Sequence, residues 1–132
     1  MKYLLDANAV IALLNGKPGM LAQVQQFVPG EVGISSIVLH ELYYGAFKSQ
    51  RAAKNVDLVA RLQFEVLEFD GEDARCAGEV RAKLALAGKP IGAYDVLIAG
   101  QALARGLVLV THNVGEFQRV EGLRLEDWEA RL

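Results

Sequence analysis

The chain contains a single cysteine, Cys76, so no disulfide can form within it. A lone cysteine with no nucleophile or metal motif around it fits a protein of a reducing compartment. Long hydrophobic runs are also missing, because no stretch reaches the roughly 18 apolar residues that a membrane-spanning helix requires. The apolar N-terminal stretch is interrupted by Asp6 and Asn8, which is unlike a secretion signal. We therefore expect a cytoplasmic protein without a membrane segment.

Proline is scarce as well, and there is no excess of positive over negative residues. With 3 prolines and 52% hydrophobic residues, the composition is not that of a disordered or fibrous chain. A length of 132 residues suits a single domain, residues 1–132, with a substantial core. The 14 Lys and Arg residues against 16 Asp and Glu give a net charge of −2, which argues against general electrostatic attraction to nucleic acid. A nuclease remains compatible with this balance, because a metal-holding site is itself acidic.

Motifs of several enzyme classes are absent. The sequence has no GxxxxGK[ST] loop and no GxGxxG fingerprint, which removes the usual nucleotide-binding classes. It has no GxSxG elbow for a hydrolytic serine and no cluster of Cys and His for zinc. A function must therefore come from other residues, and the carboxylates are the strongest candidates.

Short apolar runs alternate with longer segments of helical period, which predicts an α/β fold with a mostly parallel sheet. Strands are predicted within residues 2–5, 31–36, 64–69 and 107–110, with a further short strand near 123–126. Helices are predicted at residues 7–16, 18–27, 37–47, 52–63, 72–87 and 93–104. Gly16, Gly88 and Gly106 are expected to end three of them, and Ser35 or Ser36 to begin the third helix.

Polar residues follow two of the predicted strands. Asp6 comes directly after the first strand, and Thr111, Asn113 and Glu116 follow the strand at residues 107–110. Ligands of open parallel sheets gather beyond the carboxyl ends of the strands, so these side chains are expected at one edge. The alternative for Asp6 is that it only caps the helix that follows it.

Two further carboxylates lie in helical segments with apolar neighbours. Glu41 lies between Val38 and Leu42, and the helical face of Asp95 is otherwise apolar or small. Burying an ion costs several kcal/mol, whereas the helix dipole stabilises a first-turn carboxylate by only about 0.3 to 1 kcal/mol. A cation shared between carboxylates would explain both positions. The alternative is that each carboxylate lies at the rim of the helix packing and reaches water.

These residues supply oxygen donors only. Hard divalent cations such as Mg²⁺ prefer oxygen ligands, with water in the remaining positions. We therefore predict one site that collects Asp6, Glu41 and Asp95 around a divalent cation, together with Asn113 or Glu116.

Four stretches carry a family resemblance: LLDANAVIALL, SSIVLHELYYGAFKSQ, GKPIGAYDVLIAGQALARGLVLVTHNVGEFQRV and LEDW. In this order, over nearly the whole chain, they resemble the VapC-type toxins of the PIN-domain superfamily. The resemblance implies a three-layer α/β/α fold around a central, mostly parallel sheet. It implies an endoribonuclease dependent on Mg²⁺ or Mn²⁺, the toxin of a type II toxin–antitoxin module, that cleaves transfer or ribosomal RNA. It also implies a homodimer and a VapB-type antitoxin that blocks the site.

The resemblance carries over to individual residues. It assigns the metal to Asp6, Glu41 and Asp95, with the two aspartates holding it most directly. Asn113 falls where many relatives have a further aspartate, and Glu116 matches the acidic residue of a Glu-Phe pair. Either would complete the catalytic shell or position the attacking water.

Asn8 and Thr111 are expected to support this site from outside the metal shell. The sequence departs from the family pattern at three places. Asn113 removes one charge, Ala93 stands where a proline often precedes the Tyr-Asp pair, and His112 alters the loop after the last long strand.

Lysines and tyrosines near the predicted site have chemistry suited to RNA. Lys48 and Lys89 are candidate phosphate contacts, against the alternative of ordinary solvated charge. Tyr43, Tyr44 and Tyr94 have rings that can stack on bases. We interpret these tyrosines instead as residues of helix packing or of a dimer contact.

The expected reaction is an in-line attack of metal-activated water on a phosphodiester. By family analogy it leaves a 5′-phosphate and a 3′-hydroxyl, and the 2′-hydroxyl is not the nucleophile. Two other functions remain open on the sequence. One is an aspartate-based phosphoryl-transfer domain, such as a receiver or a haloacid-type phosphatase. The other is a PIN-like module that binds RNA or protein without catalysis, which Asn113 in place of an aspartate would favour.

Overall fold

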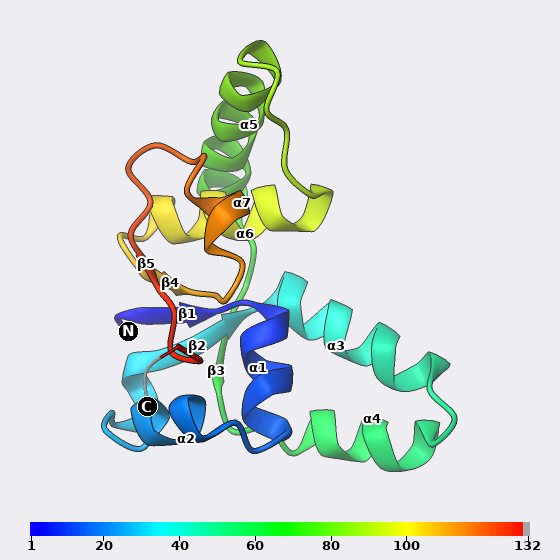
Figure 1. Cartoon of the computed structure of the whole chain (residues 1–132). Helices are drawn as coiled ribbons and strands as arrows, with labels where there is room; N and C mark the ends of the chain where they lie inside the picture. Colours follow the sequence, from blue (N-terminus) through cyan, green and yellow to red (C-terminus); the bar gives the residue numbers. More distant parts are fainter. Residues whose placement is uncertain (131–132) are drawn as a thin grey trace.

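A sheet of five parallel strands forms the centre of the molecule (Figure 1). The computed structural model describes residues 1–130. The strand order is β3-β2-β1-β4-β5, and every neighbouring pair runs parallel. The strands are β1 (Tyr3–Leu5), β2 (Val32–Ser35), β3 (Glu65–Leu67), β4 (Val108–Val110) and β5 (Leu125–Glu126). The predicted α/β class is confirmed, and the short strand near residue 125 is part of the sheet.

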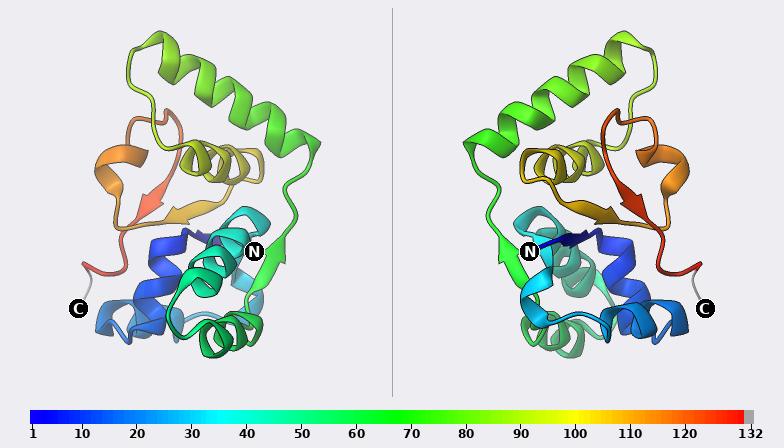
Figure 2. Two further views of the ribbon diagram at one scale, coloured as in Figure 1. Left: turned by 90° about the vertical axis from the view of Figure 1, so that its right-hand side faces the viewer. Right: turned by 90° about the vertical axis from the view of Figure 1, so that its left-hand side faces the viewer.

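Helices cover both faces of the sheet. They are α1 (Ala7–Leu14), α2 (Pro18–Val24), α3 (Ser36–Lys48), α4 (Ala52–Ala60), α5 (Gly71–Leu86), α6 (Ala93–Ala104) and α7 (Val114–Phe117), with a 3-10 turn η1 (Pro29–Glu31). Helices α1 to α4 lie on one side of the sheet, and α5 to α7 lie on the other (Figure 2). This arrangement follows from right-handed crossovers that run outward in both directions from β1. In the described part of the chain, no helix combines the length and apolar character needed to cross a membrane.

Local sequence explains where the helices begin and end. Asp6 begins α1, because its Oδ1 accepts the N–H of Ala9 at 2.8 Å. Ser35 begins α3 in the same way. Gly16, Gly88 and Gly106 follow α1, α5 and α6 with φ between 64 and 74°, as predicted, since this conformation suits glycine. Helices α1, α2 and α4 end earlier than predicted, and η1 and α7 were not predicted because such short segments show no periodicity.

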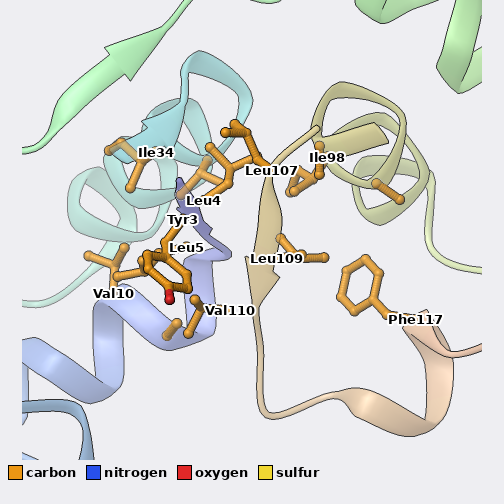
Figure 3. Close-up of a cluster of buried hydrophobic side chains, with 14 of the residues drawn as sticks. Tyr3, Leu4, Leu5, Val10, Ile34, Ile98, Leu107, Leu109, Val110 and Phe117 are labelled. Carbon is orange, nitrogen blue, oxygen red and sulfur yellow. The ribbon is translucent and has the colours of Figure 1, made fainter. Parts of the chain in front are cut away.

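Apolar side chains of the central strand β1 and of its neighbours β2 and β4 form the core (Figure 3). Leu4 and Leu5 of β1 and Leu109 and Val110 of β4 are fully buried. Helices on both faces supply the remaining partners, among them Val10, Ile98 and Phe117. Burial of each large side chain stabilises the fold by about 1.5 to 3 kcal/mol. The apolar runs that predicted the strands are therefore the residues that fix the centre of the sheet.

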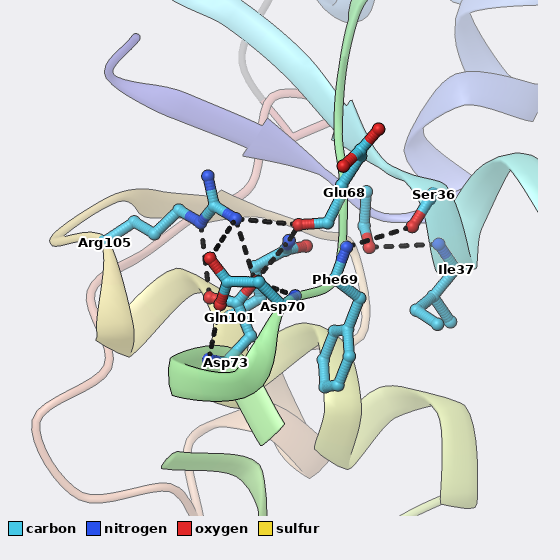
Figure 4. A network of polar contacts seen from close by, with 9 residues as sticks. Ser36, Ile37, Glu68, Phe69, Asp70, Asp73, Gln101 and Arg105 are labelled. Atoms are coloured by element: carbon cyan, nitrogen blue, oxygen red, sulfur yellow. Dashed lines mark hydrogen bonds and ion pairs between the residues drawn. The ribbon is translucent and has the colours of Figure 1, made fainter. Parts of the chain in front are cut away.

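A polar network joins α5 to α6 (Figure 4). The Asp73 carboxylate, only 1% exposed, accepts hydrogen bonds from Arg105 at 2.9 Å and from Gln101 at 3.0 Å. Burial alone would raise the pKa of Asp73, but these bonds and one from the Asp70 backbone lower it. Gly100 lets the two helices approach closely, because a Cβ there would lie 2.4 Å from the Cα of Ala77. The network fixes the helix whose first turn carries Asp95.

Candidate active site

The carboxyl ends of β1 and β4 bring Asp6 and Thr111 together. The strands pair in parallel with Leu5 opposite Val110, so the next residue of each emerges at the same edge. The Thr111 hydroxyl donates to Asp6 Oδ2 at 2.6 Å, across 105 positions of sequence. The same threonine oxygen accepts the N–H of Asn113 at 2.9 Å. Thr111 therefore holds Asp6 in place and shapes the loop after β4.

Asp6 is almost completely buried, with 4% exposed. Burial raises its pKa, the bonds from Thr111 and the Ala9 N–H oppose this, and the charges of Glu129 and Asp127 add to the rise. The net pKa is above the ordinary value. Asp6 thus caps α1 with one oxygen and also lies near other carboxylates, so capping is not its only interaction.

Glu41 is half-buried on α3 and faces Asp6. Burial raises its pKa, the charge of Asp6 raises it further, and His40 lowers it. Its Oε1 is buried without a hydrogen-bond partner among the described residues. Such an orphaned oxygen is costly, and a cation or a water that donates to it would relieve the cost.

The carboxyl groups of Asp95 and Glu116 interact directly. Burial, the Glu116 charge and a hydrogen bond between the two carboxyl groups raise the pKa of Asp95 to about 7, with smaller contributions from Asp6 and Glu41. Two carboxylates in contact need either a proton or a cation between them. The first turn of α6 thus places Asp95 among three other acidic groups rather than in water.

Glu116 is held by its own hydrogen bonds. The Gly92 N–H donates to its Oε1 at 2.6 Å, and Asn113 Nδ2 donates to its Oε2 at 2.7 Å. The Gly92 bond is the largest cause of the lowered pKa of Glu116, and the Asn113 bond adds to it. The position of Gly92 has little space, because a Cβ there would lie 3.1 Å from Asp95 Oδ2. Helix α7, which was not predicted, therefore places the negative charge of Glu116 next to Asp95.

The structure brings four predicted residues together as an acidic cluster, defined as Asp6, Glu41, Asp95 and Glu116. Asn113 and Glu116, the two candidates to complete the site, are hydrogen-bonded to each other, and which of them would complete the metal shell stays a prediction.

Other predicted residues lie outside the acidic cluster. Asn8 is exposed on α1 and makes no side-chain hydrogen bond within residues 1–130. Lys89 is exposed before α6. Lys48, at the end of α3, lies with its Nζ 4.7 Å from the ring centre of Tyr44. Neither lysine touches the cluster through a described bond.

Two acidic residues near Asp6 were missed in the sequence. Asp127 and Glu129 follow β5, and their charges contribute to the raised pKa of Asp6. Asp127 also lies 3.0 Å from Nδ1 of His112. The only sequence signal was the position of Asp127 within the stretch LEDW, because nothing local predicts that the chain returns to Asp6 after the last strand.

The acidic cluster fits a hard divalent cation by its chemistry. Its donors are all carboxylate oxygens, one of them has no hydrogen-bond partner within residues 1–130, and two of the carboxyl groups interact directly. As the side chains stand, no three His, Cys, Asp or Glu residues within 1–130 form a ready metal-holding group. Because the pKa of Asp95 is raised to about 7, cation binding would have to displace its proton near neutral pH.

A stability measurement checks the strain at Asp95. Because folding raises the pKa of Asp95 from 3.8 to about 7, the native state favours its protonated form. Its contribution to stability is full below about pH 4 and is lost as the pH rises through 7. Asn cannot titrate, so Asp95→Asn should melt higher than the unaltered chain by about 3 °C or more at pH 8 in EDTA, and by little at pH 4. A difference that stays constant across this range would contradict the assignment.

Comparison with known proteins places the chain in a family. The PIN domain profile matches residues 3–123. The tRNA(fMet)-specific endonuclease VapC of Shigella flexneri is 42% identical over 130 residues, covering 97% of this chain and 98% of the relative. Ribonuclease VapC2 of Haemophilus influenzae is 39% identical over 133 residues, again covering 97% and 98%.

Solved structures agree with the sequence relatives. The DNA-bound VapBC structure from Salmonella typhimurium contains a chain of 42% identity and TM-score 0.91, covering 97% of this chain and 98% of that one. VapBC-1 from nontypeable Haemophilus influenzae gives 35% identity and a TM-score of 0.88 with the same coverage. The chain therefore belongs to the PIN domain family and, within it, to the VapC group.

Proposed function

We propose that this chain is an RNA-cleaving toxin of a toxin–antitoxin module, a metal-dependent endoribonuclease. The observation that carries the proposal is the contact between Asp95 and Glu116, with Asp6 and Glu41 close by, at the edge where β1 and β4 end. Carboxylates in this arrangement attract a divalent cation once Asp95 has lost its proton. Relatives named as VapC ribonucleases and endonucleases support the reaction class.

Each residue has its own part in the proposed reaction. Asp6 and Asp95, with Glu41, would hold Mg²⁺ or Mn²⁺, which when bound lowers the pKa of water and neutralises charge on the phosphate. Thr111 and the Ala9 N–H fix the Asp6 carboxylate in one orientation.

The orphaned Oε1 of Glu41 can accept a hydrogen bond from the attacking water and so orient it toward phosphorus. Asn113 fixes Glu116, which accepts the Gly92 N–H as well and stays ionised beside Asp95. The products are a 5′-phosphate and a 3′-hydroxyl.

An RNA cleavage assay tests the function. The name of the Shigella relative makes transfer RNA the first substrate to try, with ribosomal RNA as the second. Purified chain with Mg²⁺ or Mn²⁺ should cut the RNA at defined positions, and EDTA should stop cleavage. Fragments that RNA ligase can join through a 5′-phosphate indicate that water, not the 2′-hydroxyl, attacks the phosphodiester. Cleavage that persists in EDTA and leaves 2′,3′-cyclic phosphates would contradict the proposal.

A groove beside the acidic cluster offers a place for the antitoxin. It has a volume of about 380 Å³ and is lined by Ile11, Leu14, Leu42, Leu58 and Val59, among others, with Glu41 at its wall. An apolar segment of a partner that fills it would also cover Glu41. The VapBC structures that resemble this chain contain both partners, which supports a VapB-type antitoxin as the occupant. A homodimer remains a prediction that light scattering would check.

Two alternatives were open on the sequence. The receiver fold has strand order 2-1-3-4-5, which differs from the order found here. A haloacid-type phosphatase requires a second aspartate where this chain has Asn8. A PIN-like module without catalysis is distinguished by the cleavage assay itself.

A further inference from the structure

Two exposed rings lie directly beside the acidic cluster. His40 precedes Glu41 on α3, and Tyr94 precedes Asp95 on α6. Their ring centres are 5.7 Å apart, and their planes are tilted by 59°. Both side chains are exposed, and Tyr94 keeps 48% of its surface in contact with solvent. Helices from different parts of the chain thus present a ring pair, His40 with Tyr94, next to the proposed catalytic carboxylates.

The exposure of Tyr94 argues against helix packing, one of the two interpretations made from the sequence, and leaves the dimer contact untested. Tyr43 does pack against the core, as predicted. Tyr44 is exposed, and Lys48 lies over its ring. Tyr94 instead stands at the first turn of α6 with His40 as its ring neighbour. An apolar ring left in water next to a reaction site is available to a ligand.

The charge around the acidic cluster indicates what such a ligand contact must supply. Four carboxyl groups form the cluster, and Asp127 and Glu129 lie near Asp6. These groups repel an RNA backbone, so phosphate contacts at this point are unfavourable without the cation. Stacking of a base on a ring does not depend on charge of either sign, and tyrosine and histidine rings both serve this purpose in proteins that bind single-stranded RNA.

We propose that His40 and Tyr94 form a stacking platform for the nucleobase next to the scissile phosphate, and that this platform sets both RNA affinity and the position of the cut. The inference rests on the proposed ribonuclease function. A phosphodiester bound through the cation at Asp95 and Glu41 would bring the base of a flanking nucleotide toward Tyr94 and His40, which precede them. The platform therefore recognises an unpaired base, which directs cleavage to loops and single strands.

The test is a double-mutant cycle that combines substitution of the ring in the protein with removal of the base from the RNA. An oligonucleotide that spans the mapped cut is made with the flanking bases intact or with one abasic nucleotide at a time. KM and kcat are measured for the unaltered chain, Tyr94→Leu, Tyr94→Phe and His40→Leu. Phe47→Leu is the matched control, because Phe47 is an exposed ring on the same helix as His40 and pairs with Tyr43 instead.

With the intact RNA, Tyr94→Leu should raise KM about 10-fold to 100-fold and change kcat little, because a base that stacks contributes about this factor. Tyr94→Phe should restore KM, His40→Leu should raise it by a smaller factor, and Phe47→Leu should leave it unchanged. At one flanking position, the abasic nucleotide should cause the same loss, and Tyr94→Leu should add nothing further to it.

If the effect of Tyr94→Leu on KM and the effect of the abasic nucleotide add at every position, the platform is overturned while the ribonuclease function stays intact. A KM unchanged by Tyr94→Leu would overturn it as well. Light scattering on the same variants separates a further case. If Tyr94→Leu dissociates a dimer and its loss of activity does not depend on the base, the ring belongs to a subunit contact and the inference is wrong. If the unaltered chain cleaves no RNA with either metal, the proposed function and the platform fail together.

Discussion

Asp6→Asn should abolish RNA cleavage, with a loss in kcat of at least about 100-fold, while the protein stays folded. The substitution removes a negative charge from the acidic cluster and leaves only one carbonyl oxygen to bind a cation. The helix start survives, because asparagine caps helices as well as aspartate and its Oδ1 can still accept the Ala9 N–H. The Thr111 hydroxyl, which now donates to Oδ2, can accept from the new amide instead.

The melting temperature distinguishes a catalytic role from a structural one. Burial raises the pKa of Asp6, so the ionised carboxylate strains the fold and neutral asparagine removes that strain. Asp6→Asn should therefore melt at the same temperature as the unaltered chain or higher at pH 7 in EDTA. Activity that falls only in proportion to a lower melting temperature would contradict the catalytic assignment.

Asp57→Asn provides the control for the same chemical change. Asp57 is exposed on α4, where it pairs with Arg61 at 2.9 Å, away from the acidic cluster. This variant should cleave RNA at the rate of the unaltered chain. Full activity in Asp6→Asn, measured beside this control at saturating Mg²⁺, would mean that the metal is held elsewhere.

Asp73→Ala should destabilise the protein by about 3 kcal/mol. The substitution leaves the Arg105 guanidinium without its carboxylate partner and deprives Gln101 of one acceptor, at a position that is 1% exposed. We take the lower end of the range for a broken buried pair, because Arg105 remains 30% exposed. Thermal unfolding should show a decrease in Tm of about 10 °C.

Glu72→Ala is the matched control on the same turn of α5. Glu72 forms an ion pair with Arg75 at 2.6 Å, but both side chains are about 60% exposed. Surface pairs contribute little, so this variant should melt almost as the unaltered chain does.

The pKa of Asp73 is lowered by folding, so the contribution of Asp73 to stability is present above about pH 4 and is lost as the pH falls. Equal melting temperatures for Asp73→Ala and Glu72→Ala would show that the buried pair contributes nothing.

Much of the fold could be predicted because the deciding interactions are local or periodic. The apolar runs of β1 and β4 predicted buried strands, and Leu4, Leu5, Leu109 and Val110 are indeed buried. Side-chain caps and glycines marked helix ends, because each acts through hydrogen bonds or φ angles of a few neighbouring residues. The assignment of α7 was missed since four residues cannot display a helical period.

The candidate site divides in the same way. An ionisable residue among apolar neighbours is visible in the sequence, and so Asp6, Glu41 and Asp95 could be identified without coordinates. The contacts that give them unusual chemistry were not visible. The interaction of Asp95 with Glu116 depends on how α7 returns to the start of α6, and the pKa of Asp6 depends in part on a segment more than 100 residues away.

The sequence by itself determined the succession of the strands and of the longer helices along the chain, and the acidic residues near their ends, because hydrophobic period and capping depend on residues close together in sequence. Only the tertiary structure decided which side chains interact: Asp95 with Glu116, Asp73 with Arg105, and His40 with Tyr94. The physical reason is that electrostatic and ring interactions act over a few ångströms. Whether two side chains come that close is set by the packing of whole helices against the sheet, which no local pattern encodes.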